Sequence, residues 1–318
     1  MHLVTLNMGG RLSPGLFVGD AVLDIPTSAP VLPEARSFAP SLRGILEAGD
    51  AGLEALARLR DRAERAQAAL IECGALVPRT HARLAAPVPD TAMVLSAGMN
   101  YHEHLKEMKT PAPATPAAFV KSNAAIVGPG EPIVLPASHP DMVDWEGEFS
   151  AVFHKPCHRV RAAEALDYIA GYTLVNDVSA RDWVAPVFKA QGVMGPIAAW
   201  EHNLLGKQFP SFCPFGPTIA TKDEIGDPNN VQLTTTLNGR VMQSANTDDL
   251  VFPLARLIEY YSQFYRFRPG DVITTGSPSG VGYGRDPKLF MRAGDTVCVT
   301  VEAIGALANP VVAATSSS

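Results

Sequence analysis

The chain has 318 residues, of which 47% are hydrophobic and 18% are charged. This composition is typical of a globular protein with a sizeable core, arranged as one large domain or two ordinary ones. The mild net charge of −6 argues against a general affinity for nucleic acid or for an anionic membrane, so we expect neither as a partner.

The four cysteines lie far apart and form no Cys-x-x-Cys pair, so the sequence indicates neither a zinc site nor a disulfide framework. The first residues, MHLVTLNMGGRL, lack the basic segment and apolar run of a signal peptide. No uninterrupted run of about 18 apolar residues occurs, so no membrane-spanning helix is predicted. We therefore expect a cytoplasmic protein.

Two short β-prone runs, HLVTL and GLFVGDAVLDI, begin the chain. Further on, Leu53, Leu56, Leu59 and later Leu70 recur at helical spacing with charges between them, which predicts a long amphipathic helix. The segment RLAAPVPD then brings two prolines close together and breaks regular structure. We therefore predict a smaller N-terminal α+β domain over residues 1–88 and a second domain over residues 89–318.

The second block consists mainly of short β-prone runs separated by glycine and proline, such as AMVLSAG, EFSAVFH and GDTVCVTVEAIG. The Asn-Gly pair in VQLTTTLNGRVMQ predicts a hairpin turn. The clearest helical pattern is LVFPLARLIEYYSQFY. Many short strands with few helices favour a β-rich roll or barrel over a doubly wound parallel sheet.

One of these runs, DMVDWEGEFSAVFH, places Asp144, Glu146 and Glu148 two residues apart. In a strand, alternate side chains point to the same face, so all three carboxylates would crowd one side. Like charges at such short range are costly unless something neutralises them, and a bound cation is one candidate.

A further carboxylate, Asp177, ends the β-prone run YTLVND. Three carboxylates from two neighbouring strands would form an oxygen-only site that suits Mg²⁺, Mn²⁺ or Ca²⁺ and not zinc. The alternative is a solvated strand face on which the acids pair with Arg159 or Arg161. Spacing alone leaves both interpretations open.

The segment GMNYHEHLKEM places His104 and Glu107 three residues apart, so on a helix they share a face and can touch. A carboxylate beside an imidazole orients it and raises its basicity, as a general base requires. An ordinary exposed helix turn is the alternative. The following run, TPAPATPAAF, predicts a mobile connector that could serve as a lid.

A late glycine-rich segment, TTGSPSGVGYG, matches neither a phosphate loop nor a dinucleotide fingerprint. Its glycines form turns or bring backbone N–H groups close to an anionic ligand. Six segments in this order resemble the fumarylacetoacetate hydrolase family: GMNYHEHLKEM, DWEGEF, AGYTLVNDVSARDW, GKQFPSFCPFGPTIAT, RPGDVITTGSPSGVG and RAGDTV. The resemblance covers roughly residues 92–301.

The resemblance implies an α+β, β-rich fold in which a mixed β-roll or sandwich catalytic domain holds a divalent cation. It implies that the cation is Mg²⁺, or Mn²⁺ or Ca²⁺, and that its ligands are Glu146, Glu148 and Asp177. Asp144 is then expected behind these ligands. A homodimer is also expected.

The resemblance implies that His104 is the water-activating base and Glu107 its orienting partner. Arg181 and Lys207 would stabilise the enolate that leaves. Six further residues are expected at the substrate: Met99, Tyr101, Val184, Phe188, Gly276 and Ser277. Because Val184 and Phe188 are apolar where relatives carry polar groups, we predict a preference for an alkyl or aryl acylpyruvate.

The implied function is hydrolysis of a carbon–carbon bond in a β-diketone or acylpyruvate-type 2-keto acid, in the catabolism of aromatic or related compounds. The divalent cation would favour the enolate and polarise the carbonyl. The same residues could also decarboxylate, isomerise or tautomerise a keto diacid. A non-catalytic ligand-binding protein is a further alternative, which the His104–Glu107 pair argues against.

Overall fold

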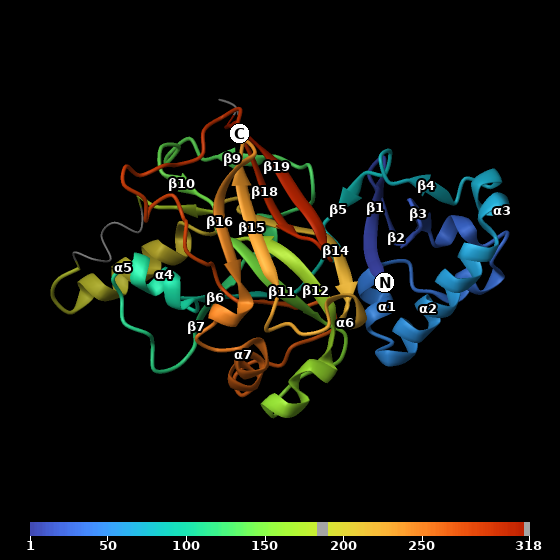
Figure 1. Ribbon diagram of the computed structural model, residues 1–318, viewed down its shortest axis with the longest axis horizontal. Coiled ribbons are helices and arrows are strands. Elements are labelled where there is room, and N and C mark those ends of the chain that lie inside the picture. The colour runs from blue at the N-terminus through green and yellow to red at the C-terminus, as the bar shows by residue number, and fades with distance from the viewer. Residues whose placement is uncertain (183–189, 315–318) are drawn as a thin grey trace.

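Strands dominate the computed structural model, which describes residues 1–182 and 190–314. The largest sheet has the order β4-β3-β2-β1-β14-β12-β11-β17-β6-β7, with β5 beside β1 and β8 beside β14 (Figure 1). Its strands are β1 His2–Met8, β2 Arg11–Val18, β3 Ala21–Asp24, β4 Leu76–Pro78, β5 Leu84–Ala85, β6 Val94–Gly98, β7 Ala117–Lys121, β8 Ile126–Val127, β11 Gly147–Phe153, β12 Ile169–Asn176, β14 Cys213–Thr221 and β17 Val272–Thr274. Most pairs are antiparallel, but β17 with β6 and β14 with β8 are parallel, so the sheet is mixed.

A second sheet, β16-β15-β18-β19-β9, packs against the large one, with β15 and β18 in front of β11 and β12 (Figure 1). Its strands are β9 Ile133–Leu135, β15 Gln232–Leu237, β16 Arg240–Asn246, β18 Thr296–Val301 and β19 Gly305–Ala313. The predicted hairpin is present: Leu237 pairs with Arg240, and the left-handed conformations of Asn238 and Gly239 form the turn. The α+β, β-rich fold expected from the sequence is confirmed.

The apolar layer between the two sheets holds the second block, residues 89–318, together. Phe149 and Tyr172 of the large sheet stack with their ring centroids 5.0 Å apart, in the same buried cluster as Leu233 and Val299 of the second sheet. Helix α7 (Leu254–Tyr261), predicted from its periodicity, contributes Leu257 to this cluster. The burial of these side chains is the main source of stability for this block.

Helices are few, and three of them belong to the N-terminal block. The α-helices of the described residues are α1 Leu42–Leu46, α2 Asp50–Arg65, α3 Gln67–Glu72, α4 His102–Glu107, α5 Met194–Leu205, α6 Lys222–Ile225 and α7. In the long helix predicted there, Leu56 and Leu59 are buried, but the helix is broken at Ala66, which leaves the helical conformation and separates α2 from α3. No described helix is long and apolar enough to cross a membrane. The cytoplasmic location stays a prediction.

The large sheet continues from one predicted domain into the other. Strand β1 pairs with β14, with His2 opposite Ala220, and the main buried cluster of the N-terminal block includes Val152 and Phe215. The N-terminal block lies at one end of the molecule, and α4 and α5 lie at the other (Figure 1). The boundary at residue 88 stays a prediction.

The single strand predicted over residues 141–154 is interrupted. Strand β10 (Val143–Asp144) pairs with β13 (Ser179–Ala180), whereas β11 starts at Gly147 and pairs with β12. Between these strands, side chains accept the backbone hydrogen bonds that a neighbouring strand would otherwise accept. Asn176 Oδ1 accepts from Glu146 N–H at 2.9 Å, and Gln243 Oε1 accepts from Gly147 N–H at 3.0 Å. The chain changes partner here because side-chain amides satisfy its backbone donors.

Gly147 lies beside this break and packs closely against the second sheet. A Cβ at this position would clash with Oγ1 of Thr235 and lie 3.0 Å from Cγ1 of Val299. Any larger residue would therefore push the second sheet away from the start of β11, between Glu146 and Glu148.

We therefore expect Gly147→Ala to lower the free energy of unfolding by about 1–3 kcal/mol, because the overpacked methyl group forces the sheets to shift. Urea-induced unfolding measures this change. Gly98→Ala is the matched control, since a Cβ there meets no atom within 4 Å. Equal stability of the two variants would contradict the prediction.

Candidate active site

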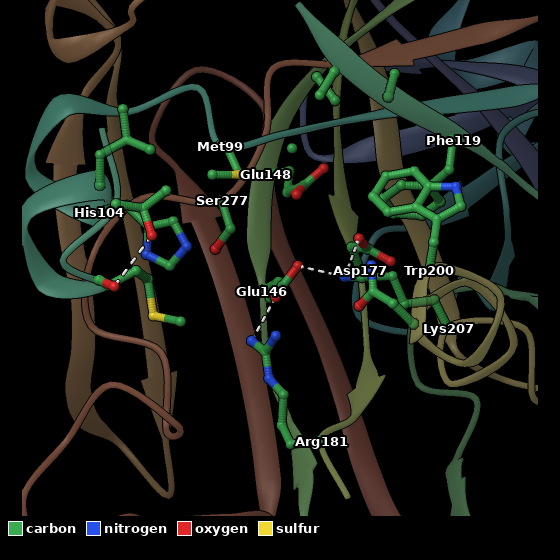
Figure 2. Close-up of a pocket in the computed structure, with 18 residues that line it drawn as sticks. Met99, His104, Phe119, Glu146, Glu148, Asp177, Arg181, Trp200, Lys207 and Ser277 are labelled. Atoms are coloured by element: carbon green, nitrogen blue, oxygen red, sulfur yellow. Dashed lines mark hydrogen bonds and ion pairs between the residues drawn. The ribbon is translucent and has the colours of Figure 1, made fainter. Parts of the chain in front are cut away.

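A cavity of about 350 Å³ opens between β6, β7, β11, α4 and α5. Figure 2 shows His104 on one side and Asp177, Lys207, Phe119 and Trp200 on the other, with Glu146 and Arg181 between them. Charged side chains lie at its floor, and much of the remaining lining is apolar: Ala97, Met99, Leu105, Met108, Phe119 and Trp200. A cavity with a few polar groups in an apolar wall is typical of a small-molecule site.

The three carboxylates predicted to be cation ligands converge at the cavity floor. Glu146, Glu148 and Asp177 are buried, and one oxygen from each lies within 4.8 Å of the others. Glu146 precedes β11, Glu148 is its second residue, and Asp177 follows β12. The N–H of Asp177 donates to the carbonyl of Glu146 at 2.8 Å, which joins the two strand ends. The alternative of a solvated strand face is wrong.

Two basic side chains predicted at the site, Lys207 and Arg181, contact these carboxylates. Lys207 Nζ lies 2.8 Å from Glu146 Oε2, 2.7 Å from Asp177 Oδ2 and 2.7 Å from Ser179 Oγ. The Nη2 atom of Arg181 donates to Glu146 Oε1, and its Nε donates to Asp144 Oδ2 at 2.8 Å. Arg181 and Lys207 are therefore held by the carboxylates of the site, and their contact with a substrate stays a prediction.

Sequence analysis missed a third cation, Lys121, at the end of β7. Its side chain is fully buried. Its Nζ pairs with Asp177 Oδ1 and donates to the backbone carbonyl of Lys207 at 2.8 Å. A single lysine at the end of the run AAFVK carries no local signal of this role, because its partners lie 56 and 86 residues away.

Burial and charge shift the pKa values of the cluster in opposite directions. Burial alone would raise the pKa of Glu146, but the charges of Lys207 and Arg181 outweigh it and lower that pKa. Burial raises the pKa of Glu148 well above its ordinary value, and the neighbouring carboxylates of Asp177 and Glu146 raise it further. Strongly perturbed carboxylates in a cavity are typical of functional sites.

These residues fit a divalent cation. The donor set consists of carboxylate oxygens only, which suits Mg²⁺, Mn²⁺ or Ca²⁺. Within the described part of the chain, Glu148 forms no ion pair, and its Oε2 accepts from Ser96 Oγ at 3.2 Å. A cation beside Glu148 would offset the cost of burying this charge.

On the facing side, the predicted pair of His104 and Glu107 is in contact on α4. Nδ1 of His104 lies 3.0 Å from Glu107 Oε2, and both side chains are only partly exposed. Glu107 also accepts from the N–H of Gly280, at 3.0 Å to Oε1 and 3.2 Å to Oε2. The pair is thus held against the glycine-rich segment, and its role as a base stays a prediction.

The glycine-rich segment does place N–H groups near anions, but those anions belong to the protein itself. Gly282 and Tyr283 donate to the carboxylate of Asp144 at 2.7 and 3.0 Å, and Gly280 donates to Glu107. This segment therefore anchors one carboxylate behind the floor of the site and one behind the imidazole.

The other residues expected at the substrate are placed differently. Met99 and Ser277 line the cavity. Gly276 does not line the cavity. Its φ is +92°, and a Cβ at this position would lie 3.2 Å from the carbonyl oxygen of Ala97, so the backbone here requires a glycine.

Tyr101 is fully buried outside the cavity lining, with its hydroxyl 3.4 Å from Thr275 Oγ1. Val184 and Phe188 lie outside the described residues. The preference for an alkyl or aryl acyl group, which rests on them, stays a prediction.

The predicted connector contributes to the cavity wall through Thr110, Ala117 and Ala118. Its last three residues do not belong to a loop, because β7 starts at Ala117, and Ala117 and Ala118 pair with Gly98 and Ala97 of β6. Sequence analysis also missed Phe119, Trp200 and Asn203, which line the cavity. Neither β7 nor α5 has a sequence pattern that indicates which of its side chains face the site.

The fold and this arrangement define a class of protein. Residues 93–312 match the sequence profile described as fumarylacetoacetate (FAA) hydrolase C-terminal. The chain therefore belongs to the fumarylacetoacetate hydrolase family, which confirms the resemblance carried by the six motifs.

Particular relatives differ in their reactions. The chain is 39% identical over 311 residues to the mitochondrial oxaloacetate tautomerase FAHD2A of Homo sapiens, covering 98% of this chain and 89% of that protein. It resembles the solved 5-carboxymethyl-2-hydroxymuconate delta-isomerase of Mycobacterium smegmatis, with TM-score 0.70, 33% identity, and 99% and 100% of the two chains covered. A maleylpyruvate hydrolase of Sphingobium sp. SYK-6 in complex with manganese (II) ion and pyruvate matches with TM-score 0.73, 25% identity and the same coverage. Members of the family are thus enzymes of more than one reaction type.

The buried ion pairs of Arg181 generate a stability prediction. Arg181→Met leaves Asp144 without its cationic partner, so we expect the free energy of unfolding to fall by about 3–5 kcal/mol. The matched control is Arg161→Met, because Arg161 pairs with Glu164 at the exposed surface. Chemical denaturation of both variants tests this, and an unchanged stability of the Arg181 variant would contradict it.

Proposed function

We propose that the protein is a divalent-cation-dependent enzyme that interconverts the enol and keto forms of a small 2-keto acid, with oxaloacetate as the first substrate to test. The observation that carries this proposal is the position of the His104–Glu107 pair across one cavity from the carboxylates and Lys207. The 39% identity to an oxaloacetate tautomerase along 98% of this chain supports it.

Glu146, Glu148 and Asp177 would hold the cation. When bound, a divalent cation acts as a Lewis acid that polarises the carbonyl of a 2-keto acid and favours its enolate. Mg²⁺ is the first candidate, and Mn²⁺ and Ca²⁺ are the alternatives for the same oxygen donors.

The chain itself supplies the base. Because Nδ1 of His104 faces Glu107, the ring proton is held on Nδ1 and Nε2 remains able to accept a proton. His104 takes the proton from the carbon next to the carbonyl. The electrons of that C–H bond form the carbon–carbon double bond, and those of the carbonyl π bond move to the oxygen. The protonated His104 then gives its proton to this oxygen, which completes the enol. The reverse transfers convert the enol to the ketone.

Lys207 and Arg181 supply positive charge at the floor of the cavity, where the carboxylate and the developing enolate oxygen of the substrate would lie. The apolar wall formed by Met99, Phe119 and Trp200 excludes water and so strengthens these interactions. A cavity of about 350 Å³ is suited to a small keto acid.

Hydrolysis of a carbon–carbon bond is the second candidate function. The same His104–Glu107 pair could deprotonate a water molecule instead of the substrate, and the similarity to a maleylpyruvate hydrolase supports this alternative. Incubation with oxaloacetate and with an acylpyruvate, followed by NMR of the products, separates the reactions. Tautomerisation keeps the carbon skeleton, decarboxylation releases CO₂ and hydrolysis yields two acids. No turnover of any keto acid would favour a ligand-binding protein.

We expect removal of divalent cations by a chelator to abolish tautomerisation of oxaloacetate, and added Mg²⁺ to restore it. Asp177→Ala should lose both divalent-cation binding and turnover, because the site has few protein ligands. Calorimetry and the rate of enol disappearance measure the two effects. Full activity of the wild type in excess chelator would contradict the proposed role of the cation.

We expect His104→Asn to lower kcat by about 10²- to 10⁴-fold, the usual contribution of a general base. His102→Asn is the matched control, since His102 lies on the same short helix but does not line the cavity. Steady-state kinetics on oxaloacetate compare the variants. If His104→Asn kept wild-type kcat, His104 would not be the base.

A further inference from the structure

Both oxygens of each of the two carboxylates at the centre of the site are paired with cations of the protein. Asp177 Oδ1 pairs with Lys121, and Glu146 Oε1 pairs with Arg181. The other oxygens, Asp177 Oδ2 and Glu146 Oε2, both face Lys207 Nζ, at 2.7 and 2.8 Å. Asp177 Oδ2 and Glu146 Oε2 therefore lie on the side where the two carboxylates face each other.

Lys121 is fixed more firmly than a surface lysine would be. Its side chain is fully buried, and its backbone pairs with Val94 in the sheet. The side-chain amide of Gln208 bonds to the backbone on both sides of it, from Nε2 to the Val120 carbonyl at 3.1 Å and from the Ser122 N–H to Oε1 at 2.7 Å. Lys121 is thus held in place at Asp177 Oδ1.

Arg181 is fixed in the same way. Its Nε donates to Asp144 Oδ2 at 2.8 Å, and Asp144 is itself held by the N–H groups of Gly282 and Tyr283. The guanidinium therefore stays beside Glu146 Oε1 because these two backbone N–H groups orient its partner Asp144.

We infer that Lys121 is a positioning residue that sets which cation the site prefers. This inference rests on the cation of the proposed function. With Oδ1 bound to Lys121, Asp177 can offer a cation only Oδ2, the oxygen that it shares with Lys207. Glu146 is limited in the same way by Arg181. Ca²⁺ takes six to eight oxygens and often binds carboxylates through both, whereas Mg²⁺ takes six ligands and keeps several waters. The site is therefore selective for Mg²⁺ or Mn²⁺ over Ca²⁺.

The test is the ratio of the dissociation constants for Mg²⁺ and Ca²⁺, measured by isothermal titration calorimetry on the full chain. We expect the wild type to bind Mg²⁺ more tightly. Lys121→Met frees the second oxygen of Asp177, so the ratio should shift toward Ca²⁺ by about tenfold. Loss of a nearby positive charge alone would tighten the binding of both divalent ions alike, and the ratio removes that effect.

Two further variants complete the experiment. Lys222→Met is the matched control, because Lys222 Nζ donates to the Leu166 carbonyl at 2.9 Å, outside the site, and its ratio should equal that of the wild type. Lys121→Ala also removes the donor to Asp177 Oδ1 and leaves room for water in place of the side chain. It should shift the ratio in the same direction, and it carries the test if the Met variant does not fold.

The outcomes separate this inference from the proposed function. If the wild type binds no divalent cation, both fall together. If it binds a cation but the ratio is unchanged in the Lys121 variants, or if the wild type prefers Ca²⁺, the inference is overturned and the proposed function stands.

Discussion

The rest of the structure depends on the burial of opposite charges in one place. The buried charges are those of Asp144, Glu146, Glu148, Asp177, Lys121, Arg181 and Lys207. In an interior of low dielectric, a charge left without its partner costs about 3–5 kcal/mol. The elements that carry these groups must therefore meet: the end of β7, the break between β10 and β11, the turn after β12 and the segment after α5. The sheets provide the rigid frame that keeps them together, through the close approach at Gly147 and the pairing of β11 with β12.

The same charges explain why the glycine-rich segment is built as it is. Its N–H groups bind Glu107 and Asp144, which lie behind the imidazole and behind Arg181. One segment therefore orients a group on each side of the cavity. Such support behind the reacting groups is what a preorganised site requires, because a donor that must reorient during the reaction loses part of its effect.

A single arrangement of this kind is compatible with several reactions. A 2-keto acid whose carbonyl is polarised can lose a proton, lose CO₂ or accept water, and each route passes through negative charge on the same oxygen. The cations at the floor serve all three. In the proposed mechanism, the dominant reaction would depend on what His104 deprotonates, and so on whether water can enter beside the apolar wall of Met99, Phe119 and Trp200. The tautomerase, isomerase and hydrolase among the relatives are consistent with this shared chemistry.

Local patterns in the sequence determined the β-rich class, helix α7, the Asn-Gly hairpin, the contact of His104 with Glu107 and, through the six motifs, the carboxylates that meet. Each depends on neighbours a few residues apart or on a recognisable motif. Only the tertiary structure decided the strand break at Glu146, the burial of Tyr101 away from the cavity and the partners of Lys121. These depend on side chains that lie from about 30 to more than 170 residues away in the chain and compete for the same buried donors and acceptors. No periodicity encodes that competition, because its outcome is settled by packing once the sheets have formed.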